Sequence, residues 1–416
     1  MAVVLFDATR LFMRASRTSP TGIDRVTEAY GRWLLGRGDV TLVPVCSWGG
    51  VLTSLSLRRF ERILDDKRSR APGSDRHWSQ LVAALDDPAG RAPGLRVPPD
   101  PDPLARPGVR YATFAMRTLA NWRPRRPAAD ALYLNVSHFG LEQPRLLERL
   151  TARGVRPVAM VHDLIPITHP EYCSAPASGW HLRRIEAVLD HAALVITNSG
   201  STAAELEAFA DARGRRRPPL RVAPLGLEPA FLTRPPPLAT GRPYFLCVGT
   251  LEPRKNVALL FTLWRRLAER LGEATPPLVL AGRRGWETEN IIDHLDRSPP
   301  IRRFVHEVSG LGDAQLARLI GGATALLAPS FSEGFDLPVA EAAVLGTPVI
   351  ASDIAAHREL AGHARLLDPV DGPAWLAAIE AATLRRPVSP PSTPFSWPEH
   401  FALVAEGLGL GADRDR

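Results

Sequence analysis

Short apolar segments alternate with longer amphipathic segments along most of this 416-residue chain. This alternation predicts parallel sheets covered by helices, because parallel strands need a crossover connection, usually a helix, between them. The expected strands form a first series near 2–6, 40–46, 131–136, 156–161, 193–197 and 220–224, and a second near 244–248, 277–281, 301–305, 324–328, 347–351 and 364–367. Helices are expected between them, for example over 256–271 and 337–345. The predicted fold class is α/β, with two doubly wound sheets.

A proline-rich run, LTRPPPLATGR at 232–242, separates the two series. Such runs commonly form linkers, and the chain is longer than one core usually organises. We therefore expect a first domain over 1–235, a second over 236–395, and a final segment, 396–416, with a helix near 398–409. Residues of about 68–130, rich in proline and arginine, are expected to be an irregular insertion in the first domain, either functional or a long surface excursion.

The cysteines and the apolar runs exclude several classes of protein. Cys46, Cys173 and Cys247 are far apart, which excludes a disulfide framework and a clustered zinc site. No apolar run reaches the roughly 18 residues of a transmembrane helix, and the first residues lack the basic start of a secretory signal. We expect a cytoplasmic protein, either free or at the inner face of the membrane.

The net charge of +7 comes from arginine, since lysine occurs only at Lys67 and Lys255. It favours an anionic partner such as a nucleotide, a phospholipid surface or an acidic saccharide. Basic stretches with interleaved aromatic residues lie at 58–62, 67–70 and 106–126; they could rest on an anionic membrane or be a solvated face of an Arg-rich protein. Asp-x-Asp pairs at 100–102 and 413–415 lie in a Pro-rich run and at the chain end, so no metal site is predicted from them.

The segment 332–352 is the most informative motif. Gly334 permits a tight turn, Pro338 suits the first turn of a helix, and Gly346 suits its end. Glu333 is then on the loop before the helix, and Glu341 is on its first turns. The two carboxylates could bind hydroxyl groups, and the free amides of the helix start between them could bind phosphate. This combination would suit a sugar-nucleotide. A capping arrangement is the structural alternative.

A second motif, at 245–256, is a buried strand followed by a glycine turn and the loop Pro253-Arg-Lys-Asn256. Arg254 and Lys255 stand where cations could reach a diphosphate. A basic pair at a helix start opposes the helix dipole, so a bound anion would relieve the conflict. A solvated loop remains the alternative.

With these motifs the chain resembles the family 4, or group 1, retaining glycosyltransferases of polysaccharide biosynthesis. The resemblance rests on residues 248–256, 278–282, 327–330, 333–341, 347–353 and 357–359, and in the first half on Thr21-Gly-Ile-Asp-Arg25 and residues 161–167, 197–199 and 223–226. It implies the GT-B architecture, two Rossmann-like domains facing across a cleft. It also implies that the last helix, entered through 395–397, packs back on the first domain.

The resemblance also implies roles for individual residues. Glu333 and its loop contact the donor sugar, Glu341 binds the ribose, and Lys255 neutralises the departing diphosphate. His162 lies near the transferred sugar, and Gly22 lets a helix start approach the phosphates. The implied catalytic residues are Glu333, Lys255 and His162, and the implied donor-binding residues are Glu341, Arg254, Thr250, Gly22, Gly334, Phe335, Asp336 and Leu337.

Two positions depart from the family pattern. Thr250 stands where many members carry arginine, so Arg254 is the expected partner cation of Lys255. Asp336 stands where glycine is frequent, which could alter the sugar contacts or the donor preference.

The implied reaction needs neither a metal nor a resident cofactor. It moves a hexose, mannose or a deoxyhexose, from a nucleotide-diphosphate sugar to a surface polysaccharide or a lipid-linked saccharide, with no nucleic-acid partner. A phosphorylase or a nucleotide-sugar epimerase would share the fold but not the reaction. The phosphorylase is disfavoured, because a pyridoxal Schiff base would need one of only two lysines. An inactive scaffold of the same shape on an anionic membrane remains the alternative.

Overall fold

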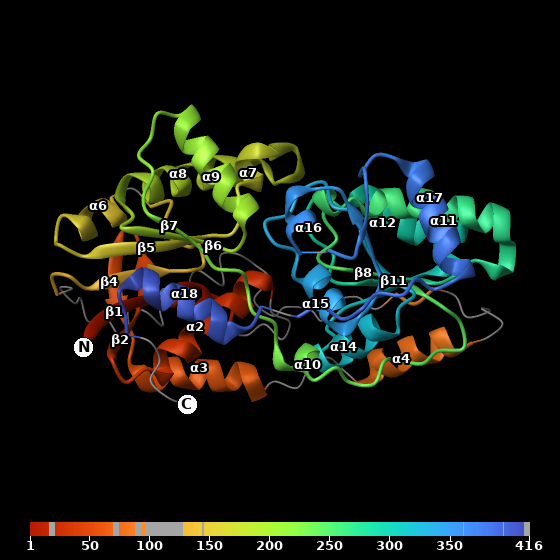
Figure 1. Cartoon of the computed structure of the whole chain (residues 1–416), viewed down its shortest axis with the longest axis horizontal. Helices are drawn as coiled ribbons and strands as arrows, with labels where there is room; N and C mark the ends of the chain where they lie inside the picture. The colour runs from red at the N-terminus through yellow and green to blue at the C-terminus, as the bar shows by residue number, and fades with distance from the viewer. Residues whose placement is uncertain are drawn as a thin grey trace.

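The structure is a computed structural model that describes residues 1–15, 21–69, 75–87, 94–96, 128–143, 145–360, 362–393 and 395–411. Two α/β domains lie side by side along the long axis of the molecule (Figure 1), each built on a largely parallel sheet. The α/β fold class with two doubly wound sheets is therefore confirmed.

The first sheet has seven strands in the order β3-β2-β1-β4-β5-β6-β7. All neighbours are parallel except β2 and β3, which form an antiparallel hairpin. The strands are β1 Ala2–Asp7, β2 Val40–Trp48, β3 Val51–Ser54, β4 Leu132–Asn135, β5 Arg156–Val161, β6 Leu194–Thr197 and β7 Leu220–Val222. The strand β3 was not expected. It follows Gly49 and Gly50, whose positive φ angles of 56° and 75° close the hairpin.

Helices cover both faces of this sheet. They are α1 Thr9–Met13, α2 Gly22–Gly36, α3 Leu57–Ser69, α6 Leu146–Thr151, α7 Ile165–Thr168, η1 Pro170–Tyr172, α8 Ala175–His191 and α9 Gly200–Ala212. Thr21 and Asp24 form a reciprocal capping box at the start of α2, and the Ser199 side chain caps α9. These caps fix two helix starts at the carboxyl end of the sheet, where open α/β sheets place their ligands.

The second sheet has six strands, all parallel, in the order β10-β9-β8-β11-β12-β13. They are β8 Phe245–Val248, β9 Leu278–Ala281, β10 Val305–Val308, β11 Ala325–Ala328, β12 Val349–Ser352 and β13 Arg365–Leu367. The surrounding helices are η2 Pro253–Lys255, α11 Val257–Leu271, η3 Gly272–Ala274, α12 Glu289–Arg297, α13 Pro299–Phe304, α14 Asp313–Gly322, α15 Leu337–Leu345, α16 Ala355–Leu360 and α17 Gly372–Leu384.

The prediction of a strand at 301–305 is wrong. Residues 299–304 form α13, and the strand is Val305–Val308. Proline at the first helical positions favours the helix, and Ile301 and Phe304, three residues apart, both lie in the core. The apolar run of helix and strand is continuous in sequence, so its pattern alone does not mark the boundary.

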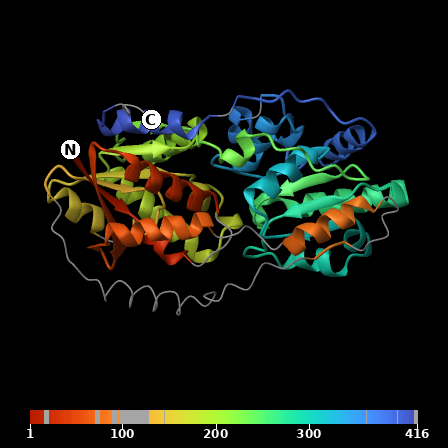
Figure 2. The same cartoon turned by 90° about the horizontal axis from the view of Figure 1, so that it is seen from below.

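Two helices pack on the domain to which their place in the sequence does not assign them. Within the stretch expected to be irregular, α4 Asp75–Asp86 packs against the second domain (Figure 2), where Leu81 and Leu85 join its core. The C-terminal helix α18 Trp397–Leu408 lies on the first domain, where Phe401 stacks on Trp33 with ring centroids 4.6 Å apart. A Cβ at Gly226 would lie 2.3 Å from the Trp397 nitrogen, so this approach requires glycine. Between the domains, α10 Pro229–Leu232 contacts α14 and α15.

Candidate active site at the domain interface

The loop before α15 touches the first domain directly. The Gly334 carbonyl accepts hydrogen bonds from Ser199 Oγ at 2.6 Å and from Thr202 Oγ1 at 3.3 Å. A Cβ on Gly334 would lie only 2.0 Å from the His162 carbonyl oxygen. Glycine is therefore required here by the contact between domains. The residue with positive φ in this turn is Asp336, at 68°, and not Gly334 as the turn pattern suggests.

Apolar contacts seat the same loop. Phe335 is 5% exposed and belongs to the hydrophobic core of the first domain, and Leu337 packs against that core. The Leu337 Cδ1 atom lies 3.5 Å from the position of a Cβ on Gly22. The N-termini of α2 and α15 thus meet across the interface, so both can direct backbone amides at one anion.

Glu333 joins the two cations of the Pro-Arg-Lys loop. Lys255 Nζ lies 2.5 Å from Glu333 Oε1, and Arg254 pairs with Glu333 and, at 2.6 Å, with Glu252. Lys255 is only 8% exposed, so the solvated-loop alternative is wrong. Burial pushes the pKa of Glu333 upward, but Arg254 and Lys255 together hold it below its usual value. The protein's own carboxylates thus relieve the charge conflict expected at this helix start.

Asp336 takes part in the same cluster. Its Oδ1 lies 3.4 Å from Lys255 Nζ, and its Oδ2 lies 3.0 Å from His357 Nε2 on α16. Burial opposes ionisation of Asp336, but the Lys255 charge and the His357 hydrogen bond lower its pKa well below its usual range. The other ring nitrogen of His357 lies 2.8 Å from the Ser352 carbonyl oxygen, which can only accept. Both ring nitrogens therefore donate, and His357 is an imidazolium with a raised pKa. His357 is in a recognised motif, but nothing in the sequence pairs it with Asp336.

A hollow opens beside this cluster at the carboxyl ends of β8 and β11. It is lined by Val248, Lys255, Ala328, Ser330, Asp336 and Pro338, among others. The Ser330 hydroxyl is buried and has no hydrogen-bond partner among the residues that the structure describes. An unpartnered hydroxyl beside a buried cation suits a polar ligand.

Glu341 is 2% exposed and is paired across the interface. Arg25 of α2 donates through Nη1 to Glu341 Oε1 at 2.8 Å, and its Nη2 lies 2.5 Å from Asp313 Oδ1. Burial raises the pKa of Glu341 to about 7, although Arg25 lowers it. The capping alternative for Glu341 is wrong, because its carboxylate binds this arginine. Arg25 belongs to the Thr-Gly-Ile-Asp-Arg motif but was not predicted to contact Glu341.

The wall of the first domain carries His162 at the end of β5. Its Nε2 donates to the Val136 carbonyl at 2.8 Å, and its backbone amide donates to His138 Nε2 at 3.2 Å. Burial lowers the pKa of His162, and nearby Arg10 lowers it further, so the ring is neutral near pH 7. Because the Val136 oxygen only accepts, Nε2 carries the proton and Nδ1 is the basic nitrogen.

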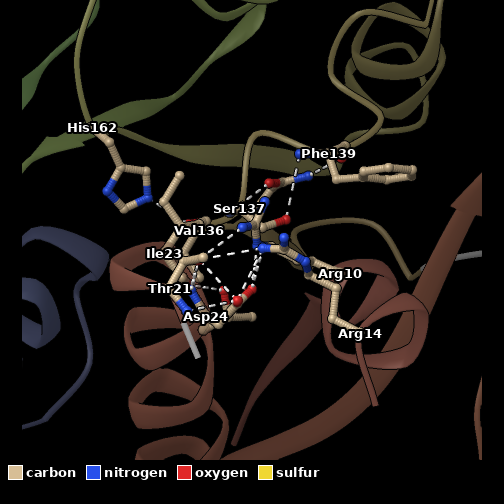
Figure 3. Close-up of polar contacts among 11 residues, drawn as sticks. Arg10, Arg14, Thr21, Ile23, Asp24, Val136, Ser137, Phe139 and His162 are labelled. Atoms are coloured by element: carbon tan, nitrogen blue, oxygen red, sulfur yellow. Dashed lines mark hydrogen bonds and ion pairs between the residues drawn. The ribbon is translucent and has the colours of Figure 1, made fainter. Parts of the chain in front are cut away.

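Two arginines not predicted from the sequence bind Asp24 at the start of α2, and one of them, Arg10, also acts on His162. Arg10 and Arg14 converge on Asp24 at 2.7 and 3.0 Å, and the Thr21 amide donates to the same carboxylate (Figure 3). These charges hold the pKa of Asp24 well below its usual range, against the effect of burial. The cluster fixes the start of α2, and with it Gly22, beside the interface.

The remaining predicted positions complete the site. Thr250 is half-buried on the loop after β8, and its methyl group would be 2.8 Å from a Cβ on Gly285. No group of three His, Cys, Asp or Glu side chains in the described ranges could hold a metal ion. The Asp-x-Asp pairs at 100–102 and 413–415 lie outside those ranges. No helix in the described part of the chain combines the length and apolarity needed to cross a membrane.

Known sequences resemble this chain over part of its length. Residues 242–383 match the family model described as glycosyl transferases group 1. An O-antigen chain mannosyltransferase B of Escherichia coli is 29% identical over 240 residues, which are 55% of this chain and 62% of the relative. An MMP alpha-(1->4)-mannosyltransferase of Mycolicibacterium hassiacum is 34% identical over 158 residues, 36% of each chain. The matches thus span less than two thirds of these relatives.

Solved structures resemble the whole fold. A sucrose-phosphate synthase of Thermosynechococcus elongatus aligns with a TM-score of 0.59 and 16% identity, covering 98% of this chain and 96% of the other. An alpha,alpha-trehalose-phosphate synthase of Burkholderia vietnamiensis aligns with a TM-score of 0.54 and 13% identity, covering 98% and 97%. At these identities the likeness concerns the fold, which is the GT-B arrangement expected from the sequence. Residues 242–383 thus match the group 1 glycosyltransferase model, and they lie in a chain with the two-domain GT-B fold.

Proposed function

We propose that this chain is a retaining, metal-independent glycosyltransferase. It moves a hexose, mannose first and a deoxyhexose second, from a nucleotide-diphosphate sugar to a growing surface polysaccharide or a lipid-linked saccharide. The observation that carries the proposal is the buried Glu333–Lys255–Arg254 cluster, seated by Gly334 against His162. The mannosyltransferase names of the relatives favour mannose as the sugar.

The donor lies at the carboxyl end of the second sheet. Glu341 accepts hydrogen bonds from the ribose hydroxyls. The diphosphate competes with Glu333 for Lys255 and Arg254, because both anions need the same two cations. Glu333 is then free to accept from hydroxyls of the sugar. Lys255 and Arg254 stabilise the charge that develops on the leaving diphosphate, which is the work a metal ion does in other transferases.

The acceptor approaches from the first domain, on the side of His162. Contacts of the donor loop with Ser199, Thr202 and His162 hold the two domains together over the donor. A closed interface excludes water, so the sugar passes to the acceptor hydroxyl and not to a water molecule.

The direct test uses GDP-mannose, UDP-glucose and a dTDP-deoxyhexose as donors, mannobiose as acceptor, and EDTA throughout. The expected result is an α-linked product from one α-linked donor, read from the anomeric coupling by NMR. Lys255→Ala should lower the rate of transfer strongly. Arg266→Ala, which changes an exposed arginine paired with Glu269, should not. A β-linked product from an α-linked donor would contradict retention. Absence of transfer and of nucleotide release from every donor would overturn the proposal and leave the scaffold alternative.

Peripheral membrane contact is part of the same proposal. Arg58 and Arg62 are exposed on α3, whereas the Arg59 guanidinium lies 4.7 Å from the Phe12 ring centroid. Of the other two basic stretches, 106–126 lies outside the described residues. Flotation with phosphatidylglycerol vesicles tests the contact. Binding that falls with salt and with Arg58→Ala/Arg62→Ala supports it, and binding unchanged by both contradicts it.

A further inference from the structure

Arg25 crosses from the first domain into the donor side of the interface. It follows the capped start of α2, and its side chain is 16% exposed. Its guanidinium contacts Glu341 on α15 and Asp313 at the start of α14. Glu228, at the residue before α10, also faces Arg25, and the Phe231 ring centroid lies 5.9 Å from the Arg25 Cζ. A cation of the first domain thus stands among carboxylates held by the linker and the second domain.

The surroundings of Glu341 explain why this cation matters. Asp313 and Asp336 face Glu341 and disfavour its ionised form, as burial does. Arg25 opposes these effects by charge and by a direct hydrogen bond. Removing the arginine would leave a buried carboxylate beside two other acids, which strongly favours a bound proton.

We propose that Arg25 is a positioning residue for the donor: it holds Glu341 as an oriented carboxylate, so that the grip on the nucleotide ribose depends on closure of the two domains. This inference rests on the proposed function. Arg25 occupies Oε1 of Glu341, which leaves Oε2 to accept from a ribose hydroxyl. When the domains separate, Arg25 leaves with α2, Glu341 takes up a proton, and the ribose loses its acceptor.

The proposal predicts a pH dependence of nucleotide binding. The pKa of Glu341 is about 7 with Arg25 in place, so affinity falls as the pH drops through that value. Without Arg25 the midpoint moves to higher pH. Affinity is then lost at pH 7 and recovers on the alkaline side. A purely structural role for Arg25 would lower affinity equally at every pH.

The test is calorimetric titration with GDP and with UDP between pH 6 and 9. It compares the parent, Arg25→Met, Arg25→Lys and Glu341→Gln. Arg25→Met should weaken binding at pH 7 about tenfold or more, the usual size of a lost charged hydrogen bond, and should approach the parent at pH 9. Glu341→Gln should lack the titration near pH 7. The terminal phosphate of the nucleotide also titrates in this range, and it does so equally in all variants. Dividing each affinity by that of Glu341→Gln at the same pH removes this shared effect.

Controls separate the possible failures. Arg32→Met, on the same helix and paired with Asp65 at 4.0 Å, should bind as the parent does. Arg25→Lys keeps a cation and should retain most of the affinity at every pH. If Arg25→Met does not fold, Arg25→Gln, which also removes the charge, takes its place. Parent-like binding at every pH by the variant that lacks the cation would overturn this inference alone. Parent-like binding by Glu341→Gln would instead overturn the donor site of the proposed function.

Discussion

The Gly334 backbone of the second domain lies against the His162 carbonyl of the first, with 2.0 Å between that oxygen and the place of a glycine Cβ. Any side chain at position 334 must push either the donor loop or the end of β5 away. The same glycine is hydrogen-bonded to Ser199 and Thr202, so the loop has little freedom to move.

Gly334→Ala should therefore damage transfer more than folding. A displacement of about 1 Å at the reacting groups can cost on the order of 100-fold in rate, and we expect a loss of that size. The matched control is Gly36→Ala, because a Cβ there would meet nothing within 4 Å. Steady-state transfer rates and melting temperatures of both variants check this. Equal rates in the two variants would show that the contact with His162 does not matter for transfer.

Lys255→Ala should lower both stability and turnover. It leaves Glu333 and Asp336 buried without the cation that lies 2.5 and 3.4 Å from them. Loss of one partner of a buried pair costs about 3 kcal/mol or more, which urea unfolding measures directly. Turnover should fall more than the selectivity among donor sugars. Unfolding like that of the parent would mean that the cluster is solvated.

Glu341 should make the free energy of unfolding fall as the pH rises. Its pKa is about 7 in the folded chain against 4.5 for an ordinary glutamate, so the folded state holds an extra proton between these values. This contribution is present below about pH 4.5 and is lost as the pH rises through 7. Urea unfolding at pH 5, 6, 7 and 8 should show that the free energy of unfolding of Glu341→Gln rises relative to that of the parent as the pH increases. A constant difference would contradict the raised pKa.

The imidazolium of His357 should depend on Asp336. In the variant Asp336→Asn the carboxylate is gone, and the pKa of His357 should fall from its raised value, because burial then dominates. Nitrogen-detected imidazole NMR measures this, with His357→Gln to assign the signal. An unchanged titration would show that the hydrogen bond at 3.0 Å does not control the ring.

The sequence predicts the elements well where apolar runs and turn residues coincide. The strand at 278–281 and the helix at 337–345 follow from local pattern, since Pro338 opens that helix and Gly346, with φ of 71°, ends it. The boundary at Phe304 does not follow, because helix and strand share one apolar run. The position of α4 on the second domain cannot be predicted from local pattern either. It depends on the packing of Leu81 and Leu85 against core residues that are distant in sequence.

The candidate site divides in the same way. Glu333, Lys255 and Arg254 stand in motifs that indicate ligand chemistry, and the structure brings them together. The pair Arg25–Glu341 joins residues 316 positions apart, and no local pattern encodes such a contact. In the motif Thr21-Gly-Ile-Asp-Arg25 the sequence assigns a role only to Gly22, because a glycine at a helix start allows close approach of a ligand. It assigns no partner to Arg25.

The central claim is that the second domain binds a nucleoside diphosphate without metal. A thermal-shift panel of UDP, GDP, dTDP, ADP and CMP in EDTA tests it most directly. A ligand at 100 times its dissociation constant adds about 2.7 kcal/mol, which raises the melting temperature measurably. The account predicts a shift with one diphosphate in the parent that is lost in Lys255→Ala. No shift with any nucleotide, with or without magnesium, would contradict it.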